Sequence, residues 1–224
     1  MKVIISSVCM LICAQSYAHS QPAASIADSM IEHSRVMRHS TLGHALSEII
    51  KEAHVSAGIV LNLTDGRDPT SADMEIASGT RLRDALNYIL GASDDRYHWV
   101  DNLGIINIVP RGGLPAVLQT QIITYHWNTL AMPNLSLSRL LSLPEVEEQL
   151  RRQGIRQGLD RGFGLQKPPR INDRVVEAGK DYVVSDVSLQ EALNAVIRSY
   201  SVPTVWIYRE AHVNNNIEVT LGDR

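Results

Sequence analysis

A spacing of apolar residues that recurs three times along the chain limits what it can fold into. Each copy places leucine, alanine, leucine and two further aliphatic residues at positions i, i+3, i+4, i+7 and i+8, and the copies begin at Leu42, Leu82 and Leu189. Residues at this spacing form one continuous stripe along an α-helix, and such a stripe is buried against another layer of the structure. We therefore expect three amphipathic helices, each packed through one face on a sheet.

The second and third copies match beyond the helix itself. Asn194 and Trp206 follow Asn87 and Trp99 at the same offset of 107 residues. Each helix also has a strand-like run before it and two strand-like runs with a turn after it, which is the pattern of a β-hairpin. These runs are 73–77, 97–100 and 105–109 in one copy, and 181–185, 204–208 and 217–221 in the other. The sequence therefore predicts an α+β fold of repeated strand-helix-hairpin units, with small sheets each packed by one or two helices.

Local signals indicate where these helices begin. Ser188 and Glu191 stand three residues apart, the spacing of a capping box in which both side chains accept hydrogen bonds from free backbone N–H groups. Ser40 and Thr80 are the N-caps that we expect for the other two helices.

Other segments lie outside the repeated units. Residues 22–39 are predicted to form a leading helix, with Ile26, Met30, His33 and Met37 on one face.

The segment 111–173 is rich in turn residues at both ends and reads as a linker. Within it we expect a strand at 121–127, a short helix at 135–141, and a further helix that starts near Pro144 with Glu145 in a capping box and ends near Gly154.

Residues 41–110 resemble the secretin and TonB short N-terminal (STN) domain family. The resemblance depends on two Leu-x-x-Ala-Leu helices, strands at 58–63 and 74–76, and a closing hairpin that ends in an Ile-x-Ile-x-Pro type run at 106–110. The polar segment 65–72 has no counterpart in that pattern. The resemblance implies a domain that sits on secretins or TonB-dependent transducers and docks onto other periplasmic proteins. Residues 174–222 look like a half or degenerate second copy.

The N-terminus is typical of a secretory signal peptide. Lys2 precedes an apolar stretch at 3–14, and Ala18 ends a small-x-small cleavage motif, so we expect cleavage between Ala18 and His19. The apolar stretch of about twelve residues is shorter than the roughly twenty that cross a bilayer. Both cysteines fall inside this leader, so the predicted mature chain contains neither disulfides nor thiolate metal sites.

This interpretation divides the chain into a signal peptide (1–18), an STN-like α+β domain (23–110), a linker with a short strand and helices (111–173), and a second strand-helix-hairpin unit (174–224). It places the mature protein in the periplasm or outside the cell, without an integral membrane span.

The charge of the chain argues against nucleic-acid binding. Its formal net charge is −3, whereas a protein that neutralises phosphates usually carries a basic surplus. One cluster of arginines, Arg151, Arg152, Arg156 and Arg161, lies among acidic residues. We expect that cluster to be a mixed, solvated helix surface.

Residue types that carry catalysis or hold metals show no recognisable pattern. His33, His39, His44 and His54 fall close together, but no two of them have the i, i+4 spacing of a zincin-type site. We expect His33 to pack on an apolar helix face.

Other signatures of chemistry are also missing. The chain has neither a Gly-x-Ser-x-Gly elbow nor a phosphate-binding glycine loop. Tyr97, Trp99, Trp206 and Tyr208 are expected in the core, with ligand stacking as the alternative. We expect no enzyme activity, no cofactor and no metal.

The function that these features favour is an exported, non-catalytic protein-interaction module of the bacterial cell envelope. The alternative is a soluble periplasmic binder of a small ligand or metal. A small open sheet keeps an unpaired edge that can accept a strand from a partner, and the last strand of each hairpin is the candidate edge. The expected partner-binding residues are Ile105, Asn107, Val109, Ile217 and Val219.

Overall fold

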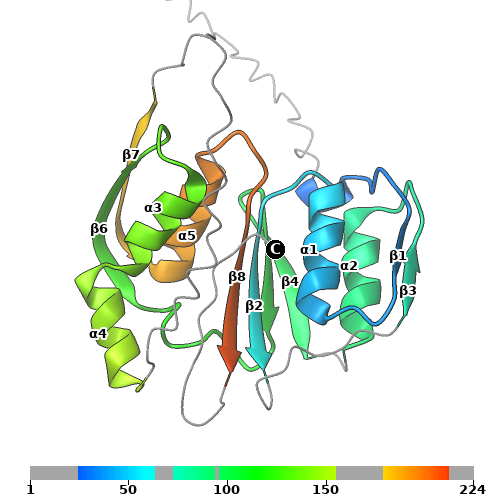
Figure 1. Cartoon of the computed structure of the whole chain (residues 1–224), viewed down its shortest axis with the longest axis horizontal. Helices are drawn as coiled ribbons and strands as arrows, with labels where there is room; N and C mark the ends of the chain where they lie inside the picture. Colours follow the sequence, from blue (N-terminus) through cyan, green and yellow to red (C-terminus); the bar gives the residue numbers. More distant parts are fainter. Residues whose placement is uncertain (1–24, 64–72, 94–95, 155–178, 212–224) are drawn as a thin grey trace, which may run out of the picture.

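A four-stranded sheet lies at the centre of the molecule, with helices on both of its faces (Figure 1). The computed structural model describes residues 25–63, 73–93, 96–154 and 179–211. In the central sheet the strand order is β4 (Tyr97–Asn102), β5 (Ile105–Pro110), β2 (Ala57–Leu63) and β8 (Val205–Ala211). Strand β2 is parallel to both β5 and β8, whereas β4 is antiparallel to β5. Helices cover both faces of this sheet, and the fold is α+β.

The first face is covered by two of the three predicted helices. Helices α1 (Leu42–Glu52) and α2 (Leu82–Gly91) pack on it with their apolar stripes. Outside them, β1 (Arg35–Met37) and β3 (Met74–Ile76) form a two-stranded antiparallel sheet. The order of layers is therefore sheet, helices and small sheet.

The second face repeats this order of layers. Helices α3 (Pro133–Leu141) and α5 (Leu189–Arg198) lie between the central sheet and an outer antiparallel pair, β6 (Gln121–Asn128) and β7 (Asp181–Ser188). Helix α4 (Pro144–Arg152) follows α3 below the same layer.

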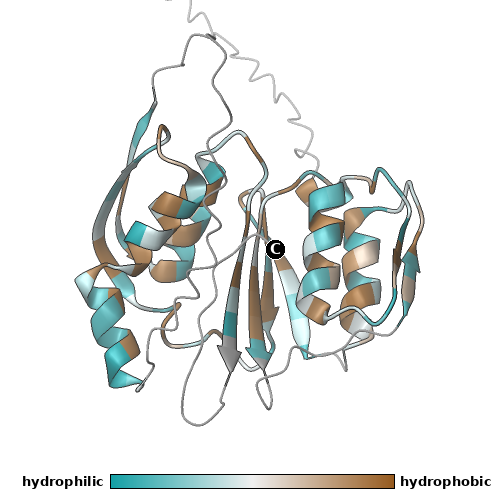
Figure 2. Ribbon diagram, in the orientation of Figure 1, coloured by the Kyte–Doolittle hydropathy of each residue, from teal (hydrophilic) through white to brown (hydrophobic). Residues whose placement is uncertain are grey.

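Apolar side chains from all of these elements form a second core, and Figure 2 shows apolar residues along the central strands that separate the two cores. Residues 121–152 of the segment that we expected to link two units thus belong to this second layer.

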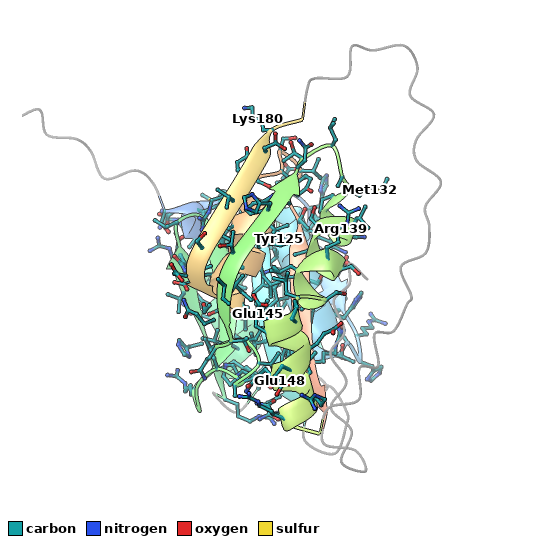
Figure 3. All side chains as sticks on the ribbon, turned by 90° about the vertical axis from the view of Figure 1, so that its left-hand side faces the viewer. Tyr125, Met132, Arg139, Glu145, Glu148 and Lys180 are labelled. Atoms are coloured by element: carbon teal, nitrogen blue, oxygen red, sulfur yellow. The ribbon has the colours of Figure 1, made fainter. Side chains whose placement is uncertain are left out.

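The second core contains a buried ladder of aromatic rings. Trp127 stacks between Tyr125 and Tyr182, with ring centroids 5.6 Å and 5.4 Å away. The Tyr125 hydroxyl donates a 2.6 Å hydrogen bond to the Ser136 carbonyl, and burial raises the pKa of Tyr125 to about 12. Figure 3 shows Tyr125 beneath β6 and Glu145 and Glu148 on α4. Trp127 Nε1 also donates to Ser199 Oγ at 2.9 Å, so the polar atoms of Tyr125 and Trp127 are satisfied inside the protein, and these two rings have a structural role.

The helix starts agree with the sequence only in part. Ser188 caps α5 in the predicted capping box with Glu191. The N-caps of α1 and α2 are Thr41 and Arg81, one residue later than expected, and Arg81 makes no side-chain cap.

Pro144 is the first residue of α4, as predicted, but the capping box there is wrong. Glu145 instead accepts a hydrogen bond from the backbone N–H of Ile123 on β6.

The predicted leading helix is wrong. Only a 3₁₀ turn, Ile26–Asp28, forms in the described part of that segment, and Arg35–Met37 is strand β1. Ile31 is buried in place of Met30, which is half exposed. The pairing of β1 with the distant β3 outweighs the local helical spacing, because this pairing buries Met37 against Met74.

None of the helices in the described ranges is long and apolar enough to cross a membrane.

Candidate protein-interaction edge

The expected partner-binding strand lies inside the central sheet. Strand β5 pairs with β4 on one side and with β2 on the other, and Ile105, Asn107 and Val109 are all buried. It therefore lacks the free edge that we expected of it, because β2 comes from an earlier part of the chain and fills that side. Ile217, Val219 and the cleavage site at Ala18 and His19 lie outside the described residues.

Asn107 has a structural role between the two layers. Its Oδ1 accepts hydrogen bonds from Asn194 Nδ2 at 3.0 Å and from Gln190 Nε2 at 3.4 Å, and its own Nδ2 donates to the Ile105 carbonyl. The two donors come from α5, so this side chain ties α5 to the central sheet.

The residues that share the offset of 107 form the same hydrogen bond twice. Trp99 Nε1 donates to Asn87 Oδ1 at 2.8 Å, between β4 and α2. Trp206 Nε1 donates to Asn194 Oδ1 at 3.0 Å, between β8 and α5. The two strand-helix pairs are thus equivalent in three dimensions as well as in sequence.

The copy that contains Trp206 is closed off by a neighbouring strand. Trp206 is 0% exposed and Asn194 is 2% exposed. In the register of the sheet, Gly58 of β2 stands directly opposite Trp206. A Cβ atom at Gly58 would lie 2.2 Å from the indole ring, so the ring occupies the space that the missing side chain leaves.

The copy that contains Trp99 lies on an open edge. Strand β4 has β5 on one side, and within the described ranges no strand pairs with its other side. Trp99 is half-buried, Asn87 is exposed, and the neighbouring Tyr88 is 54% exposed.

Backbone groups also face this open side. The strands β4 and β5 pair from Asn102 and Ile105 onward, on either side of a two-residue turn. Residues that exchange hydrogen bonds alternate in such a hairpin, so the backbone N–H and C=O of Trp99 and Asp101 point away from β5.

The tip of the β4–β5 hairpin carries an exposed leucine in a strained conformation. Leu103 has a φ of 52° and is 79% exposed, and Gly104 follows it with a φ of 81°. Two-residue turns of this kind favour asparagine, aspartate or glycine, because other side chains are disfavoured at positive φ. The Asp101 carboxylate holds the turn: it accepts hydrogen bonds from the Gly104 N–H at 3.0 Å and from the Ser25 hydroxyl at 2.8 Å.

We call this surface the β4 edge; it consists of Asn87, Tyr88, Trp99, Val100 and Leu103. The turn was predicted from the sequence, and Trp99 was expected in the core. The sequence does contain one sign of an unusual hairpin tip: Leu103 precedes Gly104 at a turn position where asparagine is preferred.

Two of the histidines in the described part of the chain lie beside a glutamate. His33 Nδ1 lies 3.1 Å from a Glu52 oxygen, and His54 Nε2 lies 3.1 Å from a Glu32 oxygen. The His33 side chain is 74% exposed, so the expectation that it packs on an apolar face is wrong. Among the described residues, no group of three or more possible ligands could hold a metal ion.

A groove of about 550 Å³ lies between β1 and the start of α1. It is lined by Val36 and Met37 and by the polar side chains of Arg38, His39 and His44, among others. The lining contains two guanidinium groups (Arg35 and Arg38), two imidazoles and the Glu48 carboxylate, and this mixture suits a small polar ligand better than an apolar one.

The other aromatic candidates lie in the core. Tyr97 and Tyr208 are buried, as is Trp206, which agrees with the expected core role of these residues. The arginine cluster also forms the mixed surface that we expected in the described range, because Glu148 pairs with both Arg151 and Arg152.

Comparison with known proteins gives no match: no family model, no curated protein and no solved structure matches this chain.

Proposed function

We propose that this chain is an exported, non-catalytic protein-interaction module that docks onto another cell-envelope protein through the β4 edge. Export rests on the signal-peptide pattern and the cleavage expected between Ala18 and His19. The order of elements from α1 to β5 (helix, strand, strand, helix, hairpin) is the order that the resemblance to STN domains implies. In that family such domains dock onto periplasmic proteins.

The observation that carries the proposal is the conformation of Leu103. A left-handed backbone at a leucine costs about 1 kcal/mol, which asparagine or glycine would largely avoid. The Leu103 side chain is 79% exposed, so burial of this side chain within the described structure does not offset the cost. Strained residues of this kind are concentrated at functional sites, and an apolar side chain at an exposed tip is suited to insertion into a pocket of a partner.

Hydrogen bonds hold the hairpin tip on both sides. Asp101 and Ser25 brace the turn on one side, and Arg198 of α5 donates to the Asn102 carbonyl on the other, at 3.2 Å. A tip held from both sides loses little conformational entropy on binding, which favours affinity.

In-cell photo-crosslinking tests the proposal. A photo-reactive amino acid at position 103 of the full chain should form a covalent adduct with one envelope protein. The same amino acid at position 123 is the matched control, because Ile123 is 69% exposed but lies on β6, away from the β4 edge. Equal adducts from both positions, or none from position 103, would contradict docking through the β4 edge.

Replacement of the leucine tests its role separately. In a chain with the photo-reactive group at Val100, Leu103→Asn should weaken the adduct. The same substitution should raise the free energy of unfolding by about 1 kcal/mol, because asparagine tolerates the left-handed conformation. A lower free energy of unfolding would show that Leu103 stabilises the fold and is not held there for a partner.

A second function, binding of a small polar ligand, is favoured by the groove beside β1 and α1. Thermal melts of the purified protein with inorganic phosphate, on wild type and His44→Ala, decide between the two. A melting-temperature increase that depends on His44, together with no adduct from position 103, would make this second function the better one.

A further inference from the structure

We infer that the β4 edge accepts an extended strand of the partner protein that runs parallel to β4 and presents a glycine opposite Trp99. The inference rests on the proposed docking function and states what the docked segment must look like. It comes from the second strand-helix pair of the same chain, in which the equivalent surface is already occupied.

The occupied example is the pairing of β8 with β2. The two strands run parallel over seven residue pairs, from Ala57 opposite Val205 to Leu63 opposite Ala211. Gly58 stands opposite Trp206, and the indole lies over the glycine while its N–H bonds to Asn194. This arrangement leaves Trp206 fully buried.

The open side of β4 corresponds to the occupied side of β8. The two strands run in opposite directions, because β4 is antiparallel to β5 whereas β2 is parallel to both β5 and β8. Trp99 packs against the core on the face of α1 and α2, whereas Trp206 packs in the core on the face of α5. A half-turn about an axis that lies in the sheet, perpendicular to the strands, therefore relates one strand-helix pair to the other.

This half-turn leaves the direction across the sheet unchanged. The side of β8 that holds β2 then corresponds to the side of β4 that is turned away from β5. Since no described strand fills that second side, the first strand-helix pair has an empty position where the second has β2.

The chemistry of the missing strand follows from this correspondence. A residue opposite Trp99 must be glycine if the indole is to lie over it as in the occupied copy, because a Cβ atom there would overlap the ring. Residues on either side of the glycine are small or aliphatic in β2, where Ala57 and Ile59 flank it. Such a strand would cover the half-exposed Trp99 and pair with the outward N–H and C=O groups of Trp99 and Asp101.

The β2 strand of a second copy of this chain is not a suitable donor. It already has β5 and β8 on its two sides, so both of its edges are filled in the folded protein. We assign the position to an extended segment of another protein, the kind of partner that the proposed docking function requires.

A peptide with the sequence of β2 serves as the probe. A fluorescent peptide of residues 55–63 with a short lysine tag for solubility is titrated into the folded full chain, and anisotropy reports binding. A second peptide carries Gly58→Val. We expect the glycine peptide to bind about tenfold more tightly, because the valine side chain cannot fit under the indole.

The preference must depend on Trp99. In Trp99→Ala both peptides should bind with similar affinity, whereas the surface control Ile123→Ala should keep the preference; circular dichroism checks that each variant is folded. Equal binding of both peptides to the wild type would overturn the glycine requirement.

The outcomes also separate this inference from the proposed function. If neither peptide binds but position 103 still forms its adduct in cells, strand addition is overturned and docking at the β4 edge stands. If a peptide binds with the expected preference but position 103 forms no adduct, the edge accepts a strand and the envelope-docking function fails.

Discussion

The two Asn–Trp hydrogen bonds are nearly identical in length, 2.8 Å and 3.0 Å, but their surroundings differ completely. Asn194 and Trp206 are buried, Trp206 lies on β8 beside β2, and Asn194 also donates a hydrogen bond to Asn107. Asn87 is exposed and Trp99 half-buried, on a strand that has one side unpaired within the described ranges. The same local motif can therefore be a core element or part of a surface, and the strand beside it decides which.

The buried and the exposed Asn–Trp hydrogen bonds should contribute differently to the stability of the protein. A hydrogen bond that lies inside the protein cannot be replaced by water, so loss of one partner leaves the other unsatisfied. An exposed bond exchanges with water at little cost. The buried copy should therefore control the stability of the protein, and the exposed copy should control what it binds.

The largest expected effect comes from filling the space under the buried tryptophan. Gly58→Val places a side chain where the Trp206 ring now lies, so the ring or β2 must move. We expect the free energy of unfolding to fall by about 3 kcal/mol in a urea melt. Gly112→Ala is the control, since no atom lies within 4 Å of its added Cβ, and it should change stability by less than about 0.5 kcal/mol. If Gly58→Val changed the free energy of unfolding only slightly, the packing of β2 against Trp206 would be loose. This packing would then not require a glycine.

An intermediate effect should separate the two asparagines. Asn194→Ala leaves the Trp206 indole N–H without its acceptor and removes a donor to Asn107, all within the core. We expect a loss of about 2 kcal/mol in the free energy of unfolding. Asn87→Ala, the matched change in the exposed copy, should cost less than about 0.5 kcal/mol. Equal losses would show that the Asn87 copy is a structural element too, and would weaken its assignment to a binding surface.

The smallest effect concerns the start of the two equivalent helices. Helix α5 has a capping box, whereas α2 begins at Arg81 without a side-chain cap. Hydrogen bonds from the Ser188 hydroxyl and backbone N–H lower the pKa of the Glu191 carboxyl. A lowered pKa in the folded state gives stability that is present above the unfolded pKa of about 4.3 and is lost as the pH falls through the folded pKa.

Wild-type protein should accordingly lose more stability between about pH 5 and about pH 3 than Glu191→Gln does. Melts at a series of pH values measure this loss, with Glu147→Gln on the exposed side of α4 as the control. If Glu191→Gln followed the wild-type pH dependence, the capping box would not be the acid-sensitive part of the second strand-helix pair.

Much of the fold could be predicted from the sequence because its signals are local. The stripes that begin at Leu42, Leu82 and Leu189 became helices α1, α2 and α5, and the Ser188 capping box formed as expected. The equivalence of Asn87–Trp99 with Asn194–Trp206 was visible as one constant offset, and the structure confirms it as two matching hydrogen bonds.

The predictions that failed depend on contacts between distant residues. Strand β5 looked like an edge because it closes its hairpin, but β2 pairs with it from about fifty residues earlier in the chain. The segment before α1 has a helical spacing, yet its residues pair with β3 or carry exposed ion pairs. No local pattern reports such pairings.

The sequence by itself determined the three helices with the repeated apolar stripe, where the tryptophans and asparagines fall relative to two of them, and that two strand-helix pairs are equivalent. These depend on periodicity and on bonds between residues a few turns apart. Only the tertiary structure decided that β8 joins the sheet beside β2, where one copy of the motif is buried, while no described strand covers the other copy. The order of strands in the sheet depends on which strand edges pair. Backbone hydrogen bonds between strands are nearly independent of side-chain identity, so this order is seen only in the assembled sheet.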